Sequence, residues 1–371
     1  MLCIASFGSN GNSPPARLQR RGLHNWAGVE LTLGTQGGDS GDPGNKGVYI
    51  YVAPAHAGNK QKKLLVDTGS SIMAFCDVSV ATKPKKQVFC DNYGRMYWWG
   101  HPYTSELSVN SGKLTIDNGT FAVAKVHHLM CSTGFEGIWG LGFPSKYVSA
   151  IGVFKEGPPK VDPKTKKLEC KDTFRAEGMV TNPLLEKLHS EGGTERFGIH
   201  WNGQWGEATG KLYLGDAAVN NDHYSMSQPL PKAWLGPASG GQYAAFVSRF
   251  VIGDWSMNNL GLACLDTGTP GMELPQAVFD HYKAASPDAI LEIELLKHDK
   301  KGTISLKFSK DKLDKLKVWN APTVQPPSLK AACSLMGLAT WAFYYVVFDV
   351  TSSTAPSVQF VPKGGDSHSP S

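Results

Sequence analysis

The sequence predicts a mostly β protein built from two lobes. The chain has 371 residues, of which 41 are glycine and 23 are proline, and so many turn formers favour short strands over long helices. Alternating runs such as residues 47–52 (GVYIYV) and 303–308 (TISLKF) are typical of strands. The second run follows residues 300–302 (KKG), a predicted hairpin turn. Two similar segments, residues 64–70 (LLVDTGS) and 263–269 (ACLDTGT), predict that each lobe carries the same loop.

Each of these segments places one aspartate behind apolar residues and ahead of a Thr-Gly pair and a hydroxyl residue. The aspartates, Asp67 and Asp266, lie 199 residues apart, about half of the chain. Two lobes of half length could therefore bring the two carboxylates together at their interface. A single Asp-Thr-Gly is most simply a turn. Two copies with matching flanks are much harder to attribute to chance.

A pair of neighbouring carboxylates has a specific chemistry. Two carboxylates a few ångströms apart cannot both ionise cheaply, so the pair shares one proton. The ionised member can take a proton from water, and the protonated member can polarise a substrate carbonyl. This chemistry needs no metal and no cofactor, and we expect neither. Since the apparent pKa values belong to the pair, the sequence assigns no fixed role to either residue.

The residues that follow the aspartates are expected to support them. They form three matched pairs: Thr68 and Thr267, Gly69 and Gly268, Ser70 and Thr269. The threonines could form hydrogen bonds across the lobe interface. The glycines can adopt backbone angles closed to other residues and leave room beside the carboxylates. The last pair could donate hydrogen bonds to the aspartate oxygens and favour the charged form.

At these residues the chain resembles the pepsin-like aspartic proteases, and other segments agree in the expected order. Residues 135–143 (FEGIWGLGF) are similar to the segment behind the first-lobe site, and residues 334–337 (SLMG) to its second-lobe counterpart. Residues 210–216 (GKLYLGD) resemble a strand that leads into the second lobe, and residues 343–349 (FYYVVFD) resemble a strand near the C-terminus. Residues 183–188 (PLLEKL) resemble a short first-lobe helix. The resemblance covers roughly residues 46–363.

The resemblance implies a mostly β, bilobed fold with a cleft between the lobes and a hairpin flap over it. It implies an N-terminal extension over residues 1–45 that could retain part of a prosegment, and a first lobe over residues 46–216 with the first motif and the flap. A second lobe over residues 217–363 carries the second motif, and residues 364–371 form a flexible tail. The implied activity is that of a monomeric endopeptidase acting on polypeptides through a water activated by Asp67 and Asp266.

Two departures from the family keep an alternative open. Ala74 stands where the family usually has a tryptophan that holds the flap tyrosine, and Pro270 stands where a small hydroxyl residue is usual. The alternative is a catalytically weak or inactive pepsin-like protein that binds or inhibits. A serine or cysteine hydrolase is less consistent with the sequence, because no Gly-x-Ser-x-Gly segment is present.

The flap tyrosine is predicted from turn chemistry. Tyr93 lies between Asn92 and Gly94, and Asn-x-Gly favours a turn. Residues 88–89 and 96–99 could form the two strands of the hairpin, and Tyr97 is the second candidate for the flap tyrosine. Because Ala74 has no indole N–H, we expect a looser flap, or one held by Trp98 or Trp99.

Cysteines and charge bear on the compartment and the partners. The chain has seven cysteines and no Cys-x-x-Cys pair, so a zinc site is not expected. The resemblance implies a disulfide between Cys76 and Cys90, whereas Cys264 could be a buried thiol or part of a bridge. It also implies the secretory pathway, a vacuole or lysosome, or the extracellular space, where Asn118 would be a glycosylation acceptor, although residues 1–7 are too short for a clear signal peptide.

Some partner classes are not expected. The net charge is +5, and the lysine-rich segments contain no recognisable nucleic-acid-binding motif, so we expect no nucleic-acid partner. No apolar run reaches the length of a membrane-spanning helix.

Overall fold

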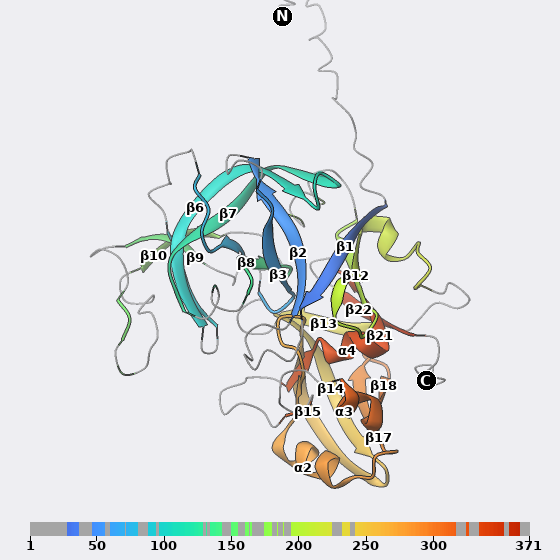
Figure 1. The fold of residues 1–371 in the computed structure, drawn as a ribbon. Coiled ribbons are helices and arrows are strands. Elements are labelled where there is room, and N and C mark those ends of the chain that lie inside the picture. The colour runs from blue at the N-terminus through green and yellow to red at the C-terminus, as the bar shows by residue number, and fades with distance from the viewer. Residues whose placement is uncertain are drawn as a thin grey trace, which may run out of the picture.

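The chain folds into two β-rich lobes joined by a shared sheet (Figure 1). The structure is a computed structural model, and it describes residues 28–36, 47–55, 60–70, 72–80, 88–93, 96–128, 131, 134–142, 150–154, 160–162, 164, 174–179, 184, 188, 194–224, 232–237, 242–316, 324–325, 334–351 and 356–363. The predicted tail 364–371 and most of the predicted extension 1–45 lie outside these residues. Among the described residues, no helix is long and apolar enough to cross a membrane.

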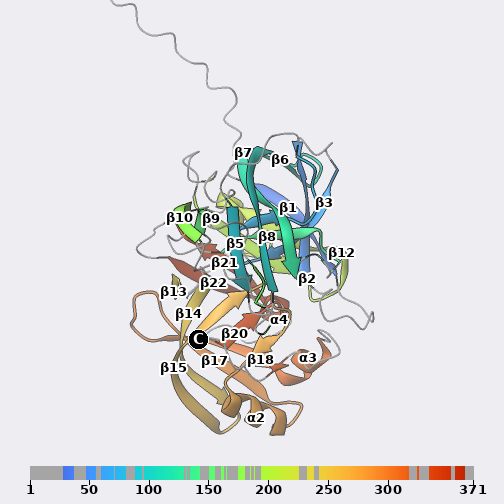
Figure 2. The same cartoon turned by 90° about the vertical axis from the view of Figure 1, so that its left-hand side faces the viewer.

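The upper lobe in Figure 1 is built from nine strands among the described residues: β2 (Gly47–Pro54), β3 (Lys62–Asp67), β4 (Met73–Phe75), β5 (Val88–Tyr93), β6 (Met96–Val109), β7 (Leu114–His128), β8 (Gly137–Gly140), β9 (Ala150–Phe154) and β10 (Phe174–Met179). The lower lobe contains β14 (Tyr243–Ile252), β15 (Trp255–Asp266), β16 (Met272–Glu273), β17 (Ile290–Leu296), β18 (Thr303–Ser309), β19 (Val324–Gln325) and β20 (Ser334–Gly337), with helices α2 (Gln276–Ala284), α3 (Lys310–Lys315) and α4 (Ala339–Phe343). Figure 2 shows the same separation from the side.

An antiparallel sheet lies between the lobes. Its strands are β1 (Val29–Gln36), β12 (Gly206–Leu214), β11 (Arg196–Trp201), β21 (Tyr344–Asp349), β22 (Ser357–Pro362) and β13 (Ala233–Pro237), in that spatial order. β1 continues into the upper lobe by pairing with β2, and β13 continues into the lower lobe by pairing with β14. Residues 29–36, which the sequence assigned to the N-terminal extension, are therefore part of the folded sheet.

Several local predictions are confirmed. Residues 303–308 lie in β18, which pairs with β17 across a turn that has positive φ at Lys300 and Gly302. In β17, buried and partly exposed residues alternate strictly, as expected of a strand with one face on the core. Leu184 and Leu188 of the predicted first-lobe helix are helical and fully buried, and a spacing of four places both on one helix face.

The two lobes repeat one arrangement around the two motifs. β3 runs parallel to β8 with Asp67 opposite Gly140, and β15 runs parallel to β20 with Asp266 opposite Gly337. Both glycines are required by close packing. A Cβ atom at Gly140 would lie 2.6 Å from the backbone oxygen of Ser70, and one at Gly337 would lie 2.3 Å from that of Thr269. The backbone of each motif loop therefore rests directly on a glycine.

The predicted disulfide between Cys76 and Cys90 is wrong. Cys76 is bonded to Cys131, with a Cα–Cα distance of 5.6 Å. Cys76 directly follows β4, which lies between β7 and β8, and Cys131 belongs to the connection between those two strands. Cys90 lies on β5, whose partners are β6 and β9. Cys264 is disulfide-bonded too.

Candidate active site

The two predicted aspartates end equivalent strands and lie at the interface of the lobes. Asp67 is the last residue of β3 and Asp266 the last residue of β15. The two residues are 7% and 8% exposed. Fully buried Val66 and Leu265 precede them and anchor the two strand ends in the core. The structure thus brings together two carboxyl groups that are far apart in the sequence and largely shielded from water.

Reciprocal hydrogen bonds join the two loops across the interface. The Thr68 hydroxyl donates to the carbonyl of Leu265 at 2.8 Å and accepts from the backbone N–H of Thr267 at 3.0 Å. The Thr267 hydroxyl donates to the carbonyl of Val66 at 2.8 Å and accepts from the N–H of Thr68 at 3.1 Å. Both threonines are fully buried, so these four bonds are protected from competition by water.

The glycines after the threonines set the position of the carboxylates. The N–H of Gly69 donates to Asp67 Oδ1 at 2.7 Å, and that of Gly268 donates to Asp266 Oδ1 at 2.8 Å. A Cβ atom at Gly69 would lie 2.5 Å from Asp266 Oδ1, and one at Gly268 would lie 2.6 Å from Asp67 Oδ1. Each carboxyl group therefore lies over the glycine of the opposite loop, and any side chain at either glycine would displace it.

Electrostatics favour one shared proton on this pair. Burial raises the pKa of Asp67 well above its usual value, and the negative charge of Asp266 and a hydrogen bond to its carboxyl group raise it further. The nearby Ser70 hydroxyl and the N–H of Gly69 act in the opposite direction but do not reverse the shift. In mild acid the pair therefore holds a proton that two separate carboxylates would release.

The third pair of support residues is not symmetric. The Thr269 hydroxyl donates to Asp266 Oδ2 at 2.7 Å. The nearby Ser70 hydroxyl lowers the pKa of Asp67, but among the described residues this buried hydroxyl has no partner that meets full hydrogen-bond geometry. Asp266 therefore accepts two well-formed hydrogen bonds where Asp67 accepts one, which favours the proton on Asp67. Sequence alone treated the two hydroxyl residues as equivalent.

The predicted flap region is a hairpin. β5 and β6 pair from Phe89 opposite Gly100 to Tyr93 opposite Met96, so Tyr93 lies at the end of the hairpin ladder. Tyr97 lies opposite Asn92 on the returning strand. The side chains of both tyrosines are outside the described part of the structure, and the choice of flap tyrosine stays a prediction.

Ala74 and Trp98 belong to one buried hydrophobic cluster. Ala74 is fully buried and belongs to a hydrophobic cluster with Ile72, Phe89 and Trp98, which is 1% exposed. The Trp98 ring lies 6.1 Å from that of Phe89, and its indole N–H is buried without a hydrogen-bond partner. Trp98, on the hairpin itself, therefore packs in the same hydrophobic cluster as Ala74.

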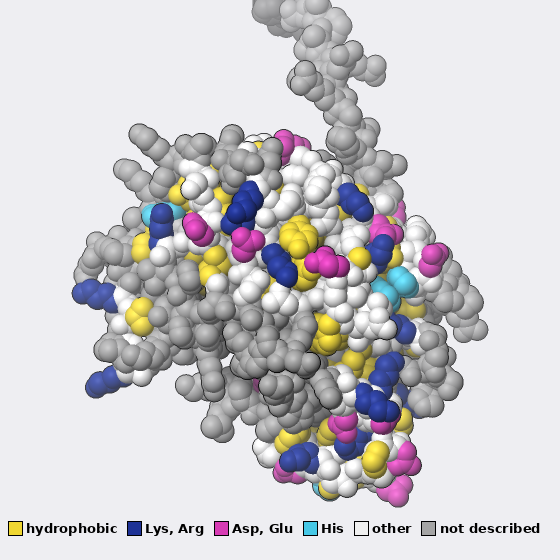
Figure 3. All heavy atoms as spheres, viewed as in Figure 1, with side chains coloured by type: hydrophobic (Ala, Val, Ile, Leu, Met, Phe, Trp, Pro, Cys, Tyr) yellow, Lys and Arg dark blue, Asp and Glu magenta, His cyan; other side chains and the backbone are white. Residues whose placement is uncertain are grey.

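The other predicted positions lie away from the aspartates or pack behind them. Pro270 is buried, and its carbonyl accepts from the N–H of Ala339 at 2.9 Å, which connects the second loop to α4. Asn118 is exposed on β7 and has a φ of 56°. Among the described residues, no group of three or more His, Cys, Asp or Glu side chains is placed to hold a metal ion. Described charges of both signs are interspersed over the face in Figure 3.

Comparison with known proteins agrees with this geometry at the level of the fold. No family model matches the sequence, and no curated protein matches it. Among solved structures, the chain is similar to the aspartic proteinase from Irpex lacteus with a TM-score of 0.63 at 16% sequence identity, over 93% of this chain and all of that one. The fold is thus the bilobed, mostly β fold of the pepsin-like aspartic proteases, as the sequence predicted.

Proposed function

We propose that this protein is an aspartic endopeptidase that hydrolyses peptide bonds through a water activated between Asp67 and Asp266. One observation carries the proposal: each carboxyl group lies over the glycine of the opposite loop, less than 3 Å from where a side chain would begin. The reciprocal threonine bonds hold that arrangement. Such a buried, preorganised pair meets the geometric requirement for general acid–base catalysis by two carboxyl groups.

The asymmetry of the pair suggests a direction for the proton transfers. The carboxylate supported by Thr269 takes a proton from the water as the water attacks the peptide carbonyl, and the protonated carboxyl group donates to the carbonyl oxygen. The tetrahedral diol then collapses as Asp266 gives its newly acquired proton to the leaving amine and Asp67 takes a proton back from one diol hydroxyl, which becomes the new carbonyl oxygen. The dyad ends with one proton, as it began, and no covalent intermediate forms.

The division into lobes, the substrates and the compartment are further parts of this proposal. We take residues 46–216 and 217–363 as the two halves that each supply one aspartate, and polypeptides as the substrates of a monomeric enzyme. Three described cysteines, Cys76, Cys131 and Cys264, are disulfide-bonded, and such bonds are typical of oxidising compartments. This supports the secretory pathway, a vacuole or lysosome, or the extracellular space.

The alternative is a pepsin-like binding or inhibitor protein without useful activity, which Ala74 keeps open. Casein or haemoglobin digestion in acid, with and without a statine-type inhibitor, separates the two. We expect digestion that the inhibitor blocks. Asp67→Asn and Asp266→Asn should each lower the rate by at least about 10²-fold, the scale of general acid–base catalysis, with an unchanged far-ultraviolet circular dichroism spectrum. Undiminished digestion by either variant would exclude the proposed dyad.

A further inference from the structure

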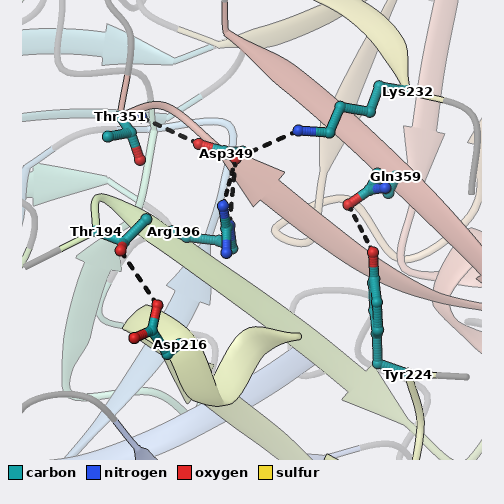
Figure 4. A network of polar contacts seen from close by, with 8 residues as sticks. All are labelled: Thr194, Arg196, Asp216, Tyr224, Lys232, Asp349, Thr351 and Gln359. Carbon is teal, nitrogen blue, oxygen red and sulfur yellow. Dashed lines mark hydrogen bonds and ion pairs between the residues drawn. The ribbon is translucent and has the colours of Figure 1, made fainter. Parts of the chain in front are cut away.

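A surface hollow of about 380 Å³ lies on the interlobe sheet, and none of the aspartate-loop residues lines it. Its lining side chains come from five separate parts of the chain: Thr194, Arg196, Lys232, His298, Asp349, Thr351 and Ser357. Figure 4 shows the central polar contacts, with Arg196 on β11 and Lys232, the residue before β13, approaching Asp349 from different sides. Because the sheet fixes these strands relative to one another, the hollow is a preformed feature.

Two cations in this hollow share one carboxylate oxygen. Asp349 Oδ2 accepts from Arg196 Nε at 3.2 Å and Nη2 at 2.8 Å, and Lys232 Nζ lies 3.7 Å from the same atom. The other oxygen, Oδ1, accepts from the backbone N–H of Thr351 at 3.3 Å. Asp349, the only carboxylate among the described lining residues, is therefore engaged on both oxygens, while Lys232 lies beyond hydrogen-bonding distance from it.

The charge of the lining is not balanced. Among the described lining residues, Arg196 and Lys232 contribute two positive charges against one negative charge on Asp349. Burial alone would raise the pKa of Asp349, but the hydrogen bond and charge of Arg196, with help from Thr351 and Lys232, lower it below its usual value. The carboxylate therefore stays ionised in mild acid. The nearby Asp216 lies outside the lining and accepts from the Thr194 hydroxyl at 3.2 Å.

We propose that this hollow binds one oxyanion group, a carboxylate or a phosphate, with Lys232 and Arg196 as its principal ligands. An ammonium group carries three donors and a guanidinium group five, and the contacts to Asp349 use only two of the guanidinium donors. A second anion between the two cations would relieve their mutual repulsion and form charge-assisted hydrogen bonds. The hydroxyl groups of Thr351 and Ser357 add two further hydrogen-bond donors to the lining.

The test uses the full chain with inorganic phosphate and, in a second arm, acetate, each at constant ionic strength set with chloride. Binding to the folded state raises the melting temperature with a saturable dependence on anion concentration, and calorimetry gives the Kd. Lys232→Gln is the informative variant, because its side chain is 44% exposed and its loss leaves the Arg196–Asp349 pair intact. Lys315→Gln is the control for charge, since Lys315 is 74% exposed on α3 and pairs with Asp311.

We expect saturable binding of the anion. Lys232→Gln should raise the Kd about tenfold, the scale of one lost hydrogen bond between charged groups, whereas Lys315→Gln should change the Kd by less than about twofold. Tighter binding of acetate would identify a carboxylate as the natural group, and tighter binding of phosphate a phosphate. Absence of saturable binding of either anion, or equal losses in the two lysine variants, would overturn the proposal. Because no measurement here depends on peptidase activity, the result is independent of the proposed function.

Discussion

At the scale of single residues, the aspartate pair is symmetric in its backbone and asymmetric in its hydroxyl groups. The threonine and glycine contacts are matched to within about 0.1 Å across the two loops. The hydroxyl contacts are not, because Thr269 reaches Asp266 and Ser70 forms no comparable bond to Asp67. Sequence could name these residues, but a hydroxyl group's hydrogen bond depends on a side-chain rotation that neighbouring residues decide.

This asymmetry predicts a difference between two conservative variants. Thr269→Val removes a hydrogen bond that stabilises the carboxylate form of the pair, so the acidic limb of the pH profile of kcat/KM should move to higher pH. One lost charge-assisted bond corresponds to about one pH unit. Ser70→Ala should move that limb much less. Equal shifts in the two variants, measured on one peptide substrate, would contradict the asymmetric assignment.

A second residue-level feature concerns stability in acid. The rings of His200 and His223 are parallel at 3.7 Å. Burial, followed by the charges of Lys363, His223 and Lys211, lowers the pKa of His200 to about 3. Burial and Lys363 also lower the pKa of His223, against the raising effect of Asp222 and Glu30. An unfolded histidine has a pKa of about 6.5, so the unfolded chain binds more protons between about pH 6.5 and 3.

The direction of the pH dependence of stability follows from this difference in proton binding. The contribution of this histidine pair to stability is complete above about pH 6.5 and is lost as the pH falls toward 3. His200→Gln should therefore reduce the fall in melting temperature between pH 7 and pH 4. His281→Gln, on α2, is the comparison, because it removes an exposed imidazole that also stacks on an aromatic ring, that of Trp255 at 4.0 Å. A fall that is just as large in His200→Gln would show that the stacked pair does not limit acid stability.

At the scale of elements, sequence predicted what depends on local periodicity and missed what depends on strand neighbours. The β17–β18 hairpin follows from alternation and a Lys-Lys-Gly turn. The partner of Cys76 could not be predicted in this way, because β4 and the β7–β8 connection meet only through sheet pairing. The role of β1 was missed for a related reason. Its residues precede the family-like segments, and its partner β12 lies more than 170 positions later.

The β5–β6 hairpin offers a test at this scale. Trp98 packs with Ala74, Ile72 and Phe89 and is 1% exposed. Trp98→Ala should lower the free energy of unfolding by about 3–5 kcal/mol through lost burial and a cavity. Trp98→Phe should cost less, because it keeps an aromatic ring and removes an indole N–H that has no partner. Urea unfolding measures both changes in the free energy of unfolding. A loss below about 1 kcal/mol for Trp98→Ala would mean that the hairpin contributes little to the core.

At the scale of the whole molecule, the bilobed architecture could be predicted because one motif occurs twice, half a chain apart. The sheet that unites the lobes could not be derived from the motifs, since its six strands come from four regions that are well separated in the sequence. The lobes are joined both by this sheet and by the threonine bonds at the aspartates. Catalytic geometry and attachment of the lobes therefore depend in part on the same residues.

This shared dependence predicts non-additive effects. Thr68→Val keeps the side-chain shape but leaves the carbonyl of Leu265 and the N–H of Thr267 without partners, at a cost of about 2–4 kcal/mol for two buried groups. Thr267→Val has the corresponding effect on Val66 and Thr68. If either substitution already separates the loops, the second substitution removes fewer hydrogen bonds. The loss in free energy of unfolding of the double variant should therefore be at least about 1 kcal/mol smaller than the sum of the losses of the two single variants. Additivity within about 0.5 kcal/mol in urea unfolding is the result expected of independent sites, and it would show that each lobe holds its own loop.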